Sequence, residues 1–137
     1  MRPALLGIGL GIIVGCATAV PPELLGRWRS DEERTLADID ERALHTPEQR
    51  AALDEMFGDL TYEFRPDGTY DWMIDGHRET VEYRIIEVGP GYVEFEGYDS
   101  LLDEVTPKRI WWEGRGSFWI WAGSEKRRFK EYFRREP

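Results

Sequence analysis

The chain has 137 residues, a formal net charge of −9 and a single cysteine. This length suits one domain, and one cysteine excludes a disulfide framework within the chain. The acidic balance argues against a nucleic-acid partner and against electrostatic docking on anionic lipid. Six residues each of Phe, Trp and Tyr supply a core that needs no disulfide even at this size.

The first residues have the pattern of an export signal. A short basic start at residues 1–3 is followed by an apolar run over residues 4–14. About eleven apolar residues are too few to span a bilayer as a helix, but they fit the hydrophobic region of a signal peptide. The run ends in the small residue Gly15, directly before Cys16. We therefore expect the chain to begin with an export leader.

The segment Ile13-Val14-Gly15-Cys16 resembles the lipobox of bacterial lipoproteins, with Ile13 where leucine is commonest. In that family the leader is cut before the cysteine, which then carries fatty acyl chains such as palmitate. The resemblance implies lipidation of Cys16 and attachment to the membrane. Because Ala17 is not aspartate, it also implies an outer-membrane lipoprotein of the bacterial cell envelope that faces the periplasm. A plain secretory signal with a chance cysteine is the alternative.

Three segments are therefore expected: a lipoprotein signal peptide over residues 1–15, a short tether over residues 16–23, and one barrel domain over residues 24–137. The tether contains two consecutive prolines and should be extended. The first strand of the domain is predicted at residues 24–29, where Trp28 supplies a large ring that a small domain must cover.

Two helices are predicted after this first strand. Ser30, followed three residues later by Glu33, matches a capping box and predicts a helix over residues 31–44. Thr46 begins a second capping signal, with proline at the first helical position. The acidic residues at 31–41 have helical spacing without histidine, which favours a solvated face over a metal site.

From Leu60 onward the apolar residues recur with a period of two, which predicts seven further strands. Turn signals at residues 66–68, 75–76 and 89–91 separate them, and residues 97–106 form the least regular connection. Short links make consecutive strands antiparallel neighbours. The pattern predicts a mainly β fold, an eight-stranded antiparallel up-and-down barrel with a helical insert between strands 1 and 2. An open sheet packed on the helices is the alternative.

The segment Gly26-Arg27-Trp28, followed by a helical stretch, a meander of strands and a closing arginine, resembles the lipocalin pattern. Lipocalins carry Gly-x-Trp on the first strand and a late arginine that packs across the tryptophan. The resemblance implies closure by Gly26 and Trp28 with Arg134 or Arg135, and we favour Arg134 because Arg135 adjoins the terminus. The chain is short for a lipocalin and lacks the helix after the barrel, so small lipocalin-like envelope domains are the nearer likeness. An ordinary core tryptophan beside a glycine is the alternative.

The sequence contains no motif typical of catalysis. His45 and His77 are expected in exposed turns, and neither has a metal-ligand spacing. Asp71 and Asp75 are expected to face solvent rather than to form a catalytic pair. There is no nucleophile elbow, phosphate loop or dinucleotide fingerprint. We therefore expect a protein that is not an enzyme and that uses no metal or cofactor.

An eight-stranded barrel is just wide enough to be filled by side chains or to hold one small ligand. We expect an inward aromatic stripe that binds a small apolar or aromatic ligand: Tyr62, Phe64, Tyr70, Trp72, Tyr83, Phe95, Trp119 and Trp121. Alternatively these rings simply fill the barrel of a structural or protein-interaction module. Exposure of Trp111 or Trp112 would favour that alternative, because adjacent strand residues point to opposite faces. A cavity above about 300 Å³ would favour the ligand.

Overall fold

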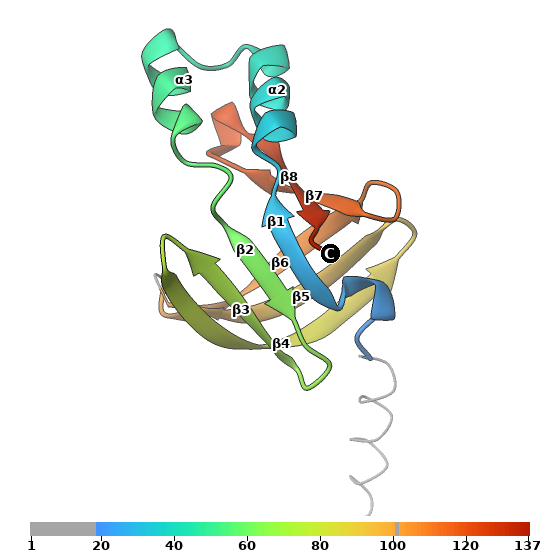
Figure 1. Cartoon of the computed structure of the whole chain (residues 1–137). Coiled ribbons are helices and arrows are strands. Elements are labelled where there is room, and N and C mark those ends of the chain that lie inside the picture. The colour runs from blue at the N-terminus through green and yellow to red at the C-terminus, as the bar shows by residue number, and fades with distance from the viewer. Residues whose placement is uncertain (1–18, 101) are drawn as a thin grey trace, which may run out of the picture.

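The computed structural model describes residues 19–100 and 102–137 (Figure 1), so Cys16 and the predicted leader lie outside the described residues. In chain order the elements are η1 (Pro22–Leu24), β1 (Gly26–Ser30), α2 (Glu32–Arg42), α3 (Pro47–Asp54), β2 (Thr61–Phe64), β3 (Thr69–Ile74), β4 (His77–Gly89), β5 (Tyr92–Asp99), β6 (Glu104–Trp112), β7 (Ser117–Ala122), η2 (Glu125–Arg127) and β8 (Phe129–Arg135).

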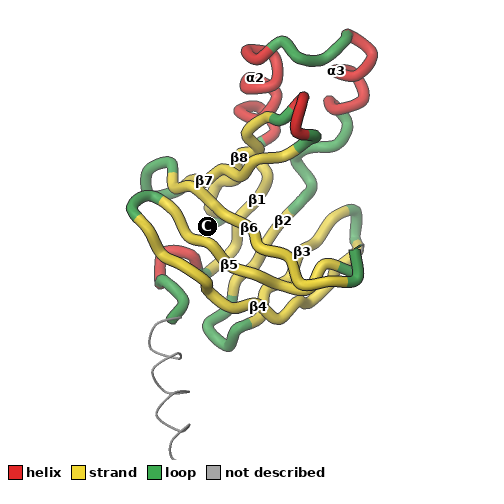
Figure 2. The backbone as a smooth tube through the Cα atoms, turned by 180° about the vertical axis from the view of Figure 1, so that it is seen from behind, coloured by secondary structure: helices red, strands yellow, loops and turns green. Residues whose placement is uncertain are grey.

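The eight strands close into a barrel in sequence order, every neighbouring pair antiparallel, with β1 also paired to β8. This confirms the predicted barrel and its helical insert, and the open-sheet alternative is wrong. Figures 1 and 2 show α2 and α3 standing beyond one end of the barrel. α2 is fixed to β8 because Thr35 Oγ1 and Asp38 Oδ2 accept hydrogen bonds from the backbone N–H groups of Tyr132 and Lys130, at 2.9 and 2.8 Å.

The helices differ from the prediction at their ends. Asp31, not Ser30, caps α2 by accepting a hydrogen bond from the backbone N–H of Arg34. Ser30 instead extends β1, since its own N–H donates to the Leu60 carbonyl. α2 stops at Arg42 because Ala43 adopts a left-handed conformation. The capping box at Thr46 is confirmed.

The connection predicted at residues 97–106 is mostly strand, because β5 runs to Asp99 and β6 begins at Glu104. Gly97 is therefore a strand residue and not a turn residue. A Cβ atom at Gly97 would lie 3.1 Å from Val81 Cγ1 and 3.5 Å from Tyr70 Cε2. Glycine at this position therefore permits the close approach of Val81 and of the Glu82 carbonyl on β4, which a Cβ atom would crowd.

The predicted extended tether also contributes to the fold. Pro22–Leu24 forms a turn of 3₁₀-helix, and the Leu24 side chain is fully buried in the core. Trp28 is fully buried beside it and donates its indole N–H to the Leu24 carbonyl at 2.9 Å. The end of the barrel where β1 begins is therefore plugged by residues that precede the first strand.

Arg135 completes this closure, and the preference for Arg134 is wrong. The Arg135 guanidinium lies 4.3 Å from the Trp28 ring centroid and donates to the Leu25 and Glu23 carbonyls at 2.7 and 2.5 Å. A Cβ atom at Gly26 would lie 2.9 Å from its Nη1, so this approach depends on glycine.

Backbone hydrogen bonds hold the C-terminal residues in place, which explains why the preference for Arg134 as the closing arginine was wrong. The Arg135 N–H donates to the Gly116 carbonyl, and the Glu136 N–H donates to the Arg27 carbonyl, both at 2.9 Å. Arg134 points to the outer face, is exposed, and forms an ion pair with Asp31 at 3.7 Å.

Replacing Arg135 with alanine should lower the free energy of unfolding by about 2 kcal/mol, because a cation–π contact and two charged hydrogen bonds are lost. The matched Arg134→Ala change should lower it by less than about 0.5 kcal/mol, since only an exposed ion pair is removed. Urea unfolding measures both values.

A double-mutant cycle of Arg135→Ala with Trp28→Leu should give a coupling of about 0.5–2 kcal/mol. Equal losses for the two arginines, or zero coupling, would contradict this closure.

Candidate functional site

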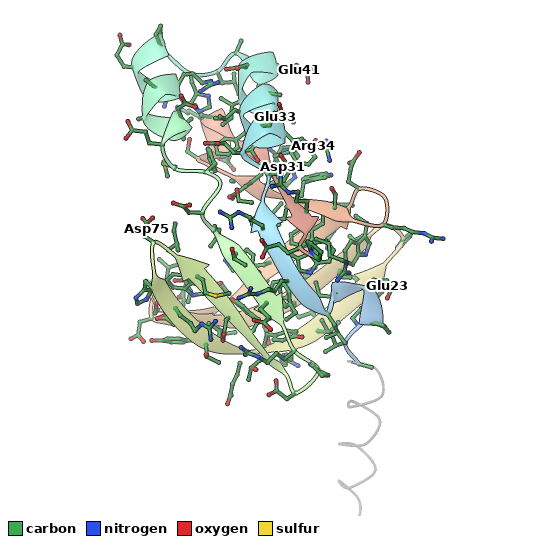
Figure 3. All side chains as sticks on the ribbon, in the orientation of Figure 1. Glu23, Asp31, Glu33, Arg34, Glu41 and Asp75 are labelled. Atoms are coloured by element: carbon green, nitrogen blue, oxygen red, sulfur yellow. The ribbon has the colours of Figure 1, made fainter. Side chains whose placement is uncertain are left out.

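A cavity of about 150 Å³ opens at the barrel end opposite the Trp28 closure. We call it the mouth cavity, and its walls are formed by Tyr62, Tyr70, Trp72, Tyr98, Asp99, Ser100 and Lys108. These residues come from β2, β3, the end of β5 with the turn after it, and the middle of β6. In Figure 3, Asp75 marks the β3–β4 turn at this end and Glu23 marks the plugged end. The volume is half the threshold of about 300 Å³ that we set for an ordinary ligand pocket.

The barrel beneath the mouth cavity is filled by side chains, which accounts for the small volume. Three residues of the predicted inward stripe lie in this filled part: Phe64, Tyr83 and Phe95. Their ring centroids lie 5.6 to 5.8 Å apart in edge-to-face contacts. The Tyr83 hydroxyl donates to the Arg65 carbonyl at 3.1 Å and is satisfied within the protein. These three residues therefore form core, and no part of the mouth cavity wall.

Three other residues of the stripe, Tyr62, Tyr70 and Trp72, do line the mouth cavity. Burial raises the pKa of Tyr70 to about 12, and it raises that of Tyr62 further, with a contribution from Glu131. Both side chains are therefore neutral phenols at physiological pH. Within the described chain neither hydroxyl has a hydrogen-bond partner, so both can bond to water or to a ligand.

The placement of Trp119 and Trp121 inside the barrel is wrong. On β7 the inward residues are Phe118, which is buried, and Ile120, which packs against the core. Because all four residues are apolar, hydrophobicity alone did not reveal which of them face inward. Trp121 remains 38% exposed on the outer face.

Trp119 and Trp121 belong instead to an outer aromatic row that runs Tyr92, Trp111, Trp119, Trp121. Successive ring centroids in this row lie 5.1 to 5.7 Å apart. Cations cover the rings: Arg109 over Tyr92, Lys130 over Trp119 and Arg128 over Trp121. Arg109 is also paired with Glu94 at 2.7 Å, so the row carries charges of both signs.

Two charged residues of the barrel interior were not predicted. Lys108 lines the mouth cavity two residues before the buried Ile110, and Glu131 lies between the buried Phe129 and Phe133. The alternation of side chains along a strand places each of them on the inward face. This parity was the signal in the sequence that could have identified both residues.

Glu131 is 9% exposed and interacts electrostatically with Lys108 and Tyr62. Burial raises the pKa of this carboxyl group to about 7, and the positive charge of Lys108 partly offsets that increase. Among the described residues, neither Glu131 nor Lys108 has a hydrogen bond or an ion pair. The barrel interior therefore holds a carboxyl group and an ammonium group that have no direct partner among the described side chains.

The two hairpin aspartates lie in different settings. Asp71 does not face solvent as expected: it is 1% exposed, and Arg65 and Thr80 bind its carboxylate at 3.1 and 2.6 Å. The Arg65 hydrogen bonds lower the pKa of Asp71 to about 2. Asp75 lies exposed at the hairpin tip. No cluster of three or more possible metal ligands occurs in residues 19–100 and 102–137.

The two histidines lie in different settings. His77 is exposed at the start of β4, where its ring is 5.2 Å from that of Trp72. His45 is not the exposed turn residue that was expected, because its ring packs 6.1 Å from Phe129 and its Nδ1 is buried without a hydrogen-bond partner.

A larger hollow of about 450 Å³ lies at the plugged end, between Glu23, Trp112, Gly114, Arg115 and Arg135. The Arg135 guanidinium is already bonded to two carbonyls there. We therefore assign this region to closure of the barrel and place the candidate site at the mouth cavity.

No family model, curated protein or solved structure matches this chain. In the part of the chain that the structure describes, no helix has the length and apolar character needed to cross a membrane. The functional argument therefore depends on the residues of the mouth cavity.

Glu131 should make the protein less stable as the pH rises from about 4.5 to about 7. The folded state holds the Glu131 proton more tightly than the unfolded chain, where the pKa is 4.5, so the stabilisation is complete below pH 4.5 and is lost by about pH 7. The difference between the Glu131 pKa values of the unfolded and folded states corresponds to a loss of about 3 kcal/mol in the free energy of unfolding. In urea unfolding, Glu131→Gln should match the wild type at about pH 4 and exceed it by about 3 kcal/mol at about pH 8. The unfolding free energy of the exposed control Glu125→Gln should follow that of the wild type at every pH. If the difference between Glu131→Gln and the wild type does not change with pH, the assignment is contradicted.

Proposed function

We propose that this chain is a lipid-anchored protein of the bacterial cell envelope whose barrel binds a small molecule with an aromatic or apolar part, without converting it. The observation that carries the proposal is the mouth cavity, where three aromatic side chains meet an unpaired ammonium group. Ligand sites typically combine apolar walls with a few placed polar groups. The cavity suits a ligand of roughly ten non-hydrogen atoms, since it has room for several water molecules.

The lipocalin likeness supports this proposal. The stacking of Arg135 on Trp28 beside Gly26 agrees with the arrangement that the likeness implied. The barrel differs from a deep ligand-binding barrel, because Tyr83 and Phe95 occupy its interior. The ligand proposed here is therefore much smaller than a fatty acid and lies near the rim.

The membrane anchor is proposed from the sequence alone. The lipobox-like segment ending at Cys16 supports acylation, and Ala17 supports sorting to the outer membrane. Two or more acyl chains give stable anchoring, whereas one alone binds marginally. The first turn of the fold, Pro22–Leu24, follows this cysteine by only a few residues in sequence, so the barrel would stay close to the membrane surface.

A second candidate function is that of an interaction module whose barrel is structural. The outer aromatic row favours it, because Trp121 is partly exposed and the row carries cations of its own. Aromatic residues and arginine are enriched in the energetically dominant parts of protein interfaces. This function requires no ligand in the mouth cavity, which separates it from the first.

Benzyl alcohol, a small neutral aromatic probe, should bind the mouth cavity with a Kd of about 1 mM or tighter. Binding should change the tryptophan fluorescence through Trp72, so Trp72→Phe should remove the change, whereas the matched Trp121→Phe variant should keep it. Palmitate should bind no more tightly than benzyl alcohol, because the cavity is too small for its chain. A response lost in Trp121→Phe but kept in Trp72→Phe, or no response at all, would favour the interaction module.

Cys16→Ser should leave the protein uncut or release it from the membrane fraction of a bacterial host, because the acyl acceptor is lost. Fractionation with a high-salt wash, followed by mass spectrometry of the N-terminus, measures both outcomes. A variant that is still cut and still bound to the membrane would contradict the lipoprotein proposal.

A further inference from the structure

The outer aromatic row crosses neighbouring strands from residue to residue. Tyr92 of β5 lies opposite Trp111 of β6, and Trp111 lies opposite Trp119 of β7. Trp119 in turn lies opposite Tyr132 of β8, so aromatic rings follow one another over four adjacent strands. Trp121, two residues after Trp119 on the same face, is 38% exposed. This part of the outer face is therefore built from aromatic rings.

Cations lie on these rings at short distances. The distances from cation to ring centroid are 4.1 Å for Arg34 over Tyr132, 4.3 Å for Lys130 over Trp119, 3.9 Å for Arg128 over Trp121 and 5.0 Å for Arg42 over Trp121. A cation that rests on a ring has already lost side-chain freedom, so it pairs with an incoming anion at a lower entropic cost. The rings thus hold a set of positive charges ready for a partner.

The cations of this face divide into two groups. Three of them pair with carboxylates of their own chain: Arg109 with Glu94 at 2.7 Å, Arg42 with Asp38 at 2.6 Å and Arg34 with Glu113 at 3.8 Å. Arg128 and Lys130 differ, because within the described chain their side chains form no hydrogen bond and no ion pair. Their positive charges are therefore available to another molecule.

Two more cations adjoin this unpaired pair. Lys126 and Arg127 of η2 are exposed, and among residues 19–100 and 102–137 neither side chain has an ion pair. We call Lys126, Arg127, Arg128 and Lys130 the basic patch. Beside it in sequence stands one acidic residue, Glu125. The patch is a local excess of positive charge on a chain whose formal net charge is −9.

The basic patch lies far from the plugged end of the barrel. Figures 1 and 2 show the β7–β8 turn at the end of the molecule that carries α2 and α3, with η1 at the other end. Arg42 of α2 over Trp121 places the last turn of α2 beside the patch. A protein tethered through the residues before η1 would therefore leave this face free to meet a partner.

We propose that the basic patch and Trp121 dock a partner protein through a cluster of acidic side chains on that partner. Carboxylates of the partner pair with Arg128 and Lys130, and Trp121 supplies the aromatic contact beside them. Charge complementarity selects an acidic partner, and Trp and Arg are residues that dominate the energetics of protein interfaces. This inference goes beyond the ligand proposed for the mouth cavity, and it rests on the second candidate function, whose partner it describes.

The arrangement favours a protein over other polyanions. Cations already cover the rings of Trp119 and Trp121, so little ring surface is free to enter a bilayer or to stack on nucleic-acid bases. An anionic bilayer would also place negative charge opposite the exposed Glu33 and Glu41 of α2, which Figure 3 labels. A protein can place its carboxylates over the basic patch alone.

A deca-glutamate peptide is the probe, titrated into the full chain at low ionic strength and followed by calorimetry and tryptophan fluorescence. It should bind with a Kd of about 0.1 mM or tighter, and added salt should weaken it. Deca-lysine, the matched cationic peptide, should not bind. Two further polyanions are titrated in parallel: vesicles of equal parts phosphatidylcholine and phosphatidylglycerol, and deca-thymidylate. Both should bind more weakly than the acidic peptide.

Four variants locate the contact. Arg128→Gln and Lys130→Gln should each weaken deca-glutamate by about threefold, and together by about tenfold. Trp121→Leu keeps every charge but should also weaken it by about threefold, because Arg128 is no longer held on a ring. Arg115→Gln is the matched control, since Arg115 is exposed at the β6–β7 turn and forms no ion pair within the described chain. It should leave the affinity unchanged, and circular dichroism confirms that each variant is folded.

Each contrary outcome overturns the inference in its own way. If Arg115→Gln weakens the peptide as much as Arg128→Gln does, binding follows net charge and not this face. If the vesicles or deca-thymidylate bind more tightly than the peptide, the face is an interaction surface but its partner is not an acidic protein. If none of the polyanions binds, the charge argument for the interaction module falls as well. The benzyl alcohol response, measured on the same samples, tests the mouth cavity separately and should persist in Arg128→Gln.

Discussion

The contact between Arg135 and Trp28 joins the two ends of the folded chain, and the barrel depends on it. The guanidinium covers the indole face and holds two carbonyls of the segment that precedes β1. The indole N–H holds the Leu24 carbonyl of the same segment. Three separate pieces of backbone are thereby fixed at one end of the barrel. Because β1 pairs with both β2 and β8, this end has no free sheet edge that could pair with another chain.

The barrel is closed at the Trp28 end, and the candidate site lies at the opposite end. Leu24 and Trp28 plug one end of the barrel and Phe64, Tyr83 and Phe95 fill its middle, while the small mouth cavity lies at the other end. An apolar core would be the stable solution there, but the chain places Lys108 and Glu131 on the inward face. A protein that keeps an unpaired buried carboxyl group gives up stability near neutral pH. That loss is the physical reason to regard Glu131 as more than a packing residue.

The strand order, the helical insert and the closing tryptophan were predictable from local patterns, because alternation and turn residues are short-range signals. Three features were not. The inward residues of β7 were misassigned because Phe118–Trp121 is apolar on both faces. The closing arginine was misassigned because backbone hydrogen bonds, which no composition reveals, pin Arg135. The cavity volume depends on how Tyr83 and Phe95 pack across the barrel, which only the tertiary structure specifies.

The claim central to this account is that Glu131 is an ionisable group enclosed in the barrel. Carbon-13 NMR of the glutamate side-chain carboxyl groups, assigned with Glu131→Gln, tests it directly by following each resonance through a pH titration. The account predicts that Glu131 titrates near a pKa of about 7, because burial disfavours the charged carboxylate. A Glu131 resonance that titrates close to 4.5 would contradict the account.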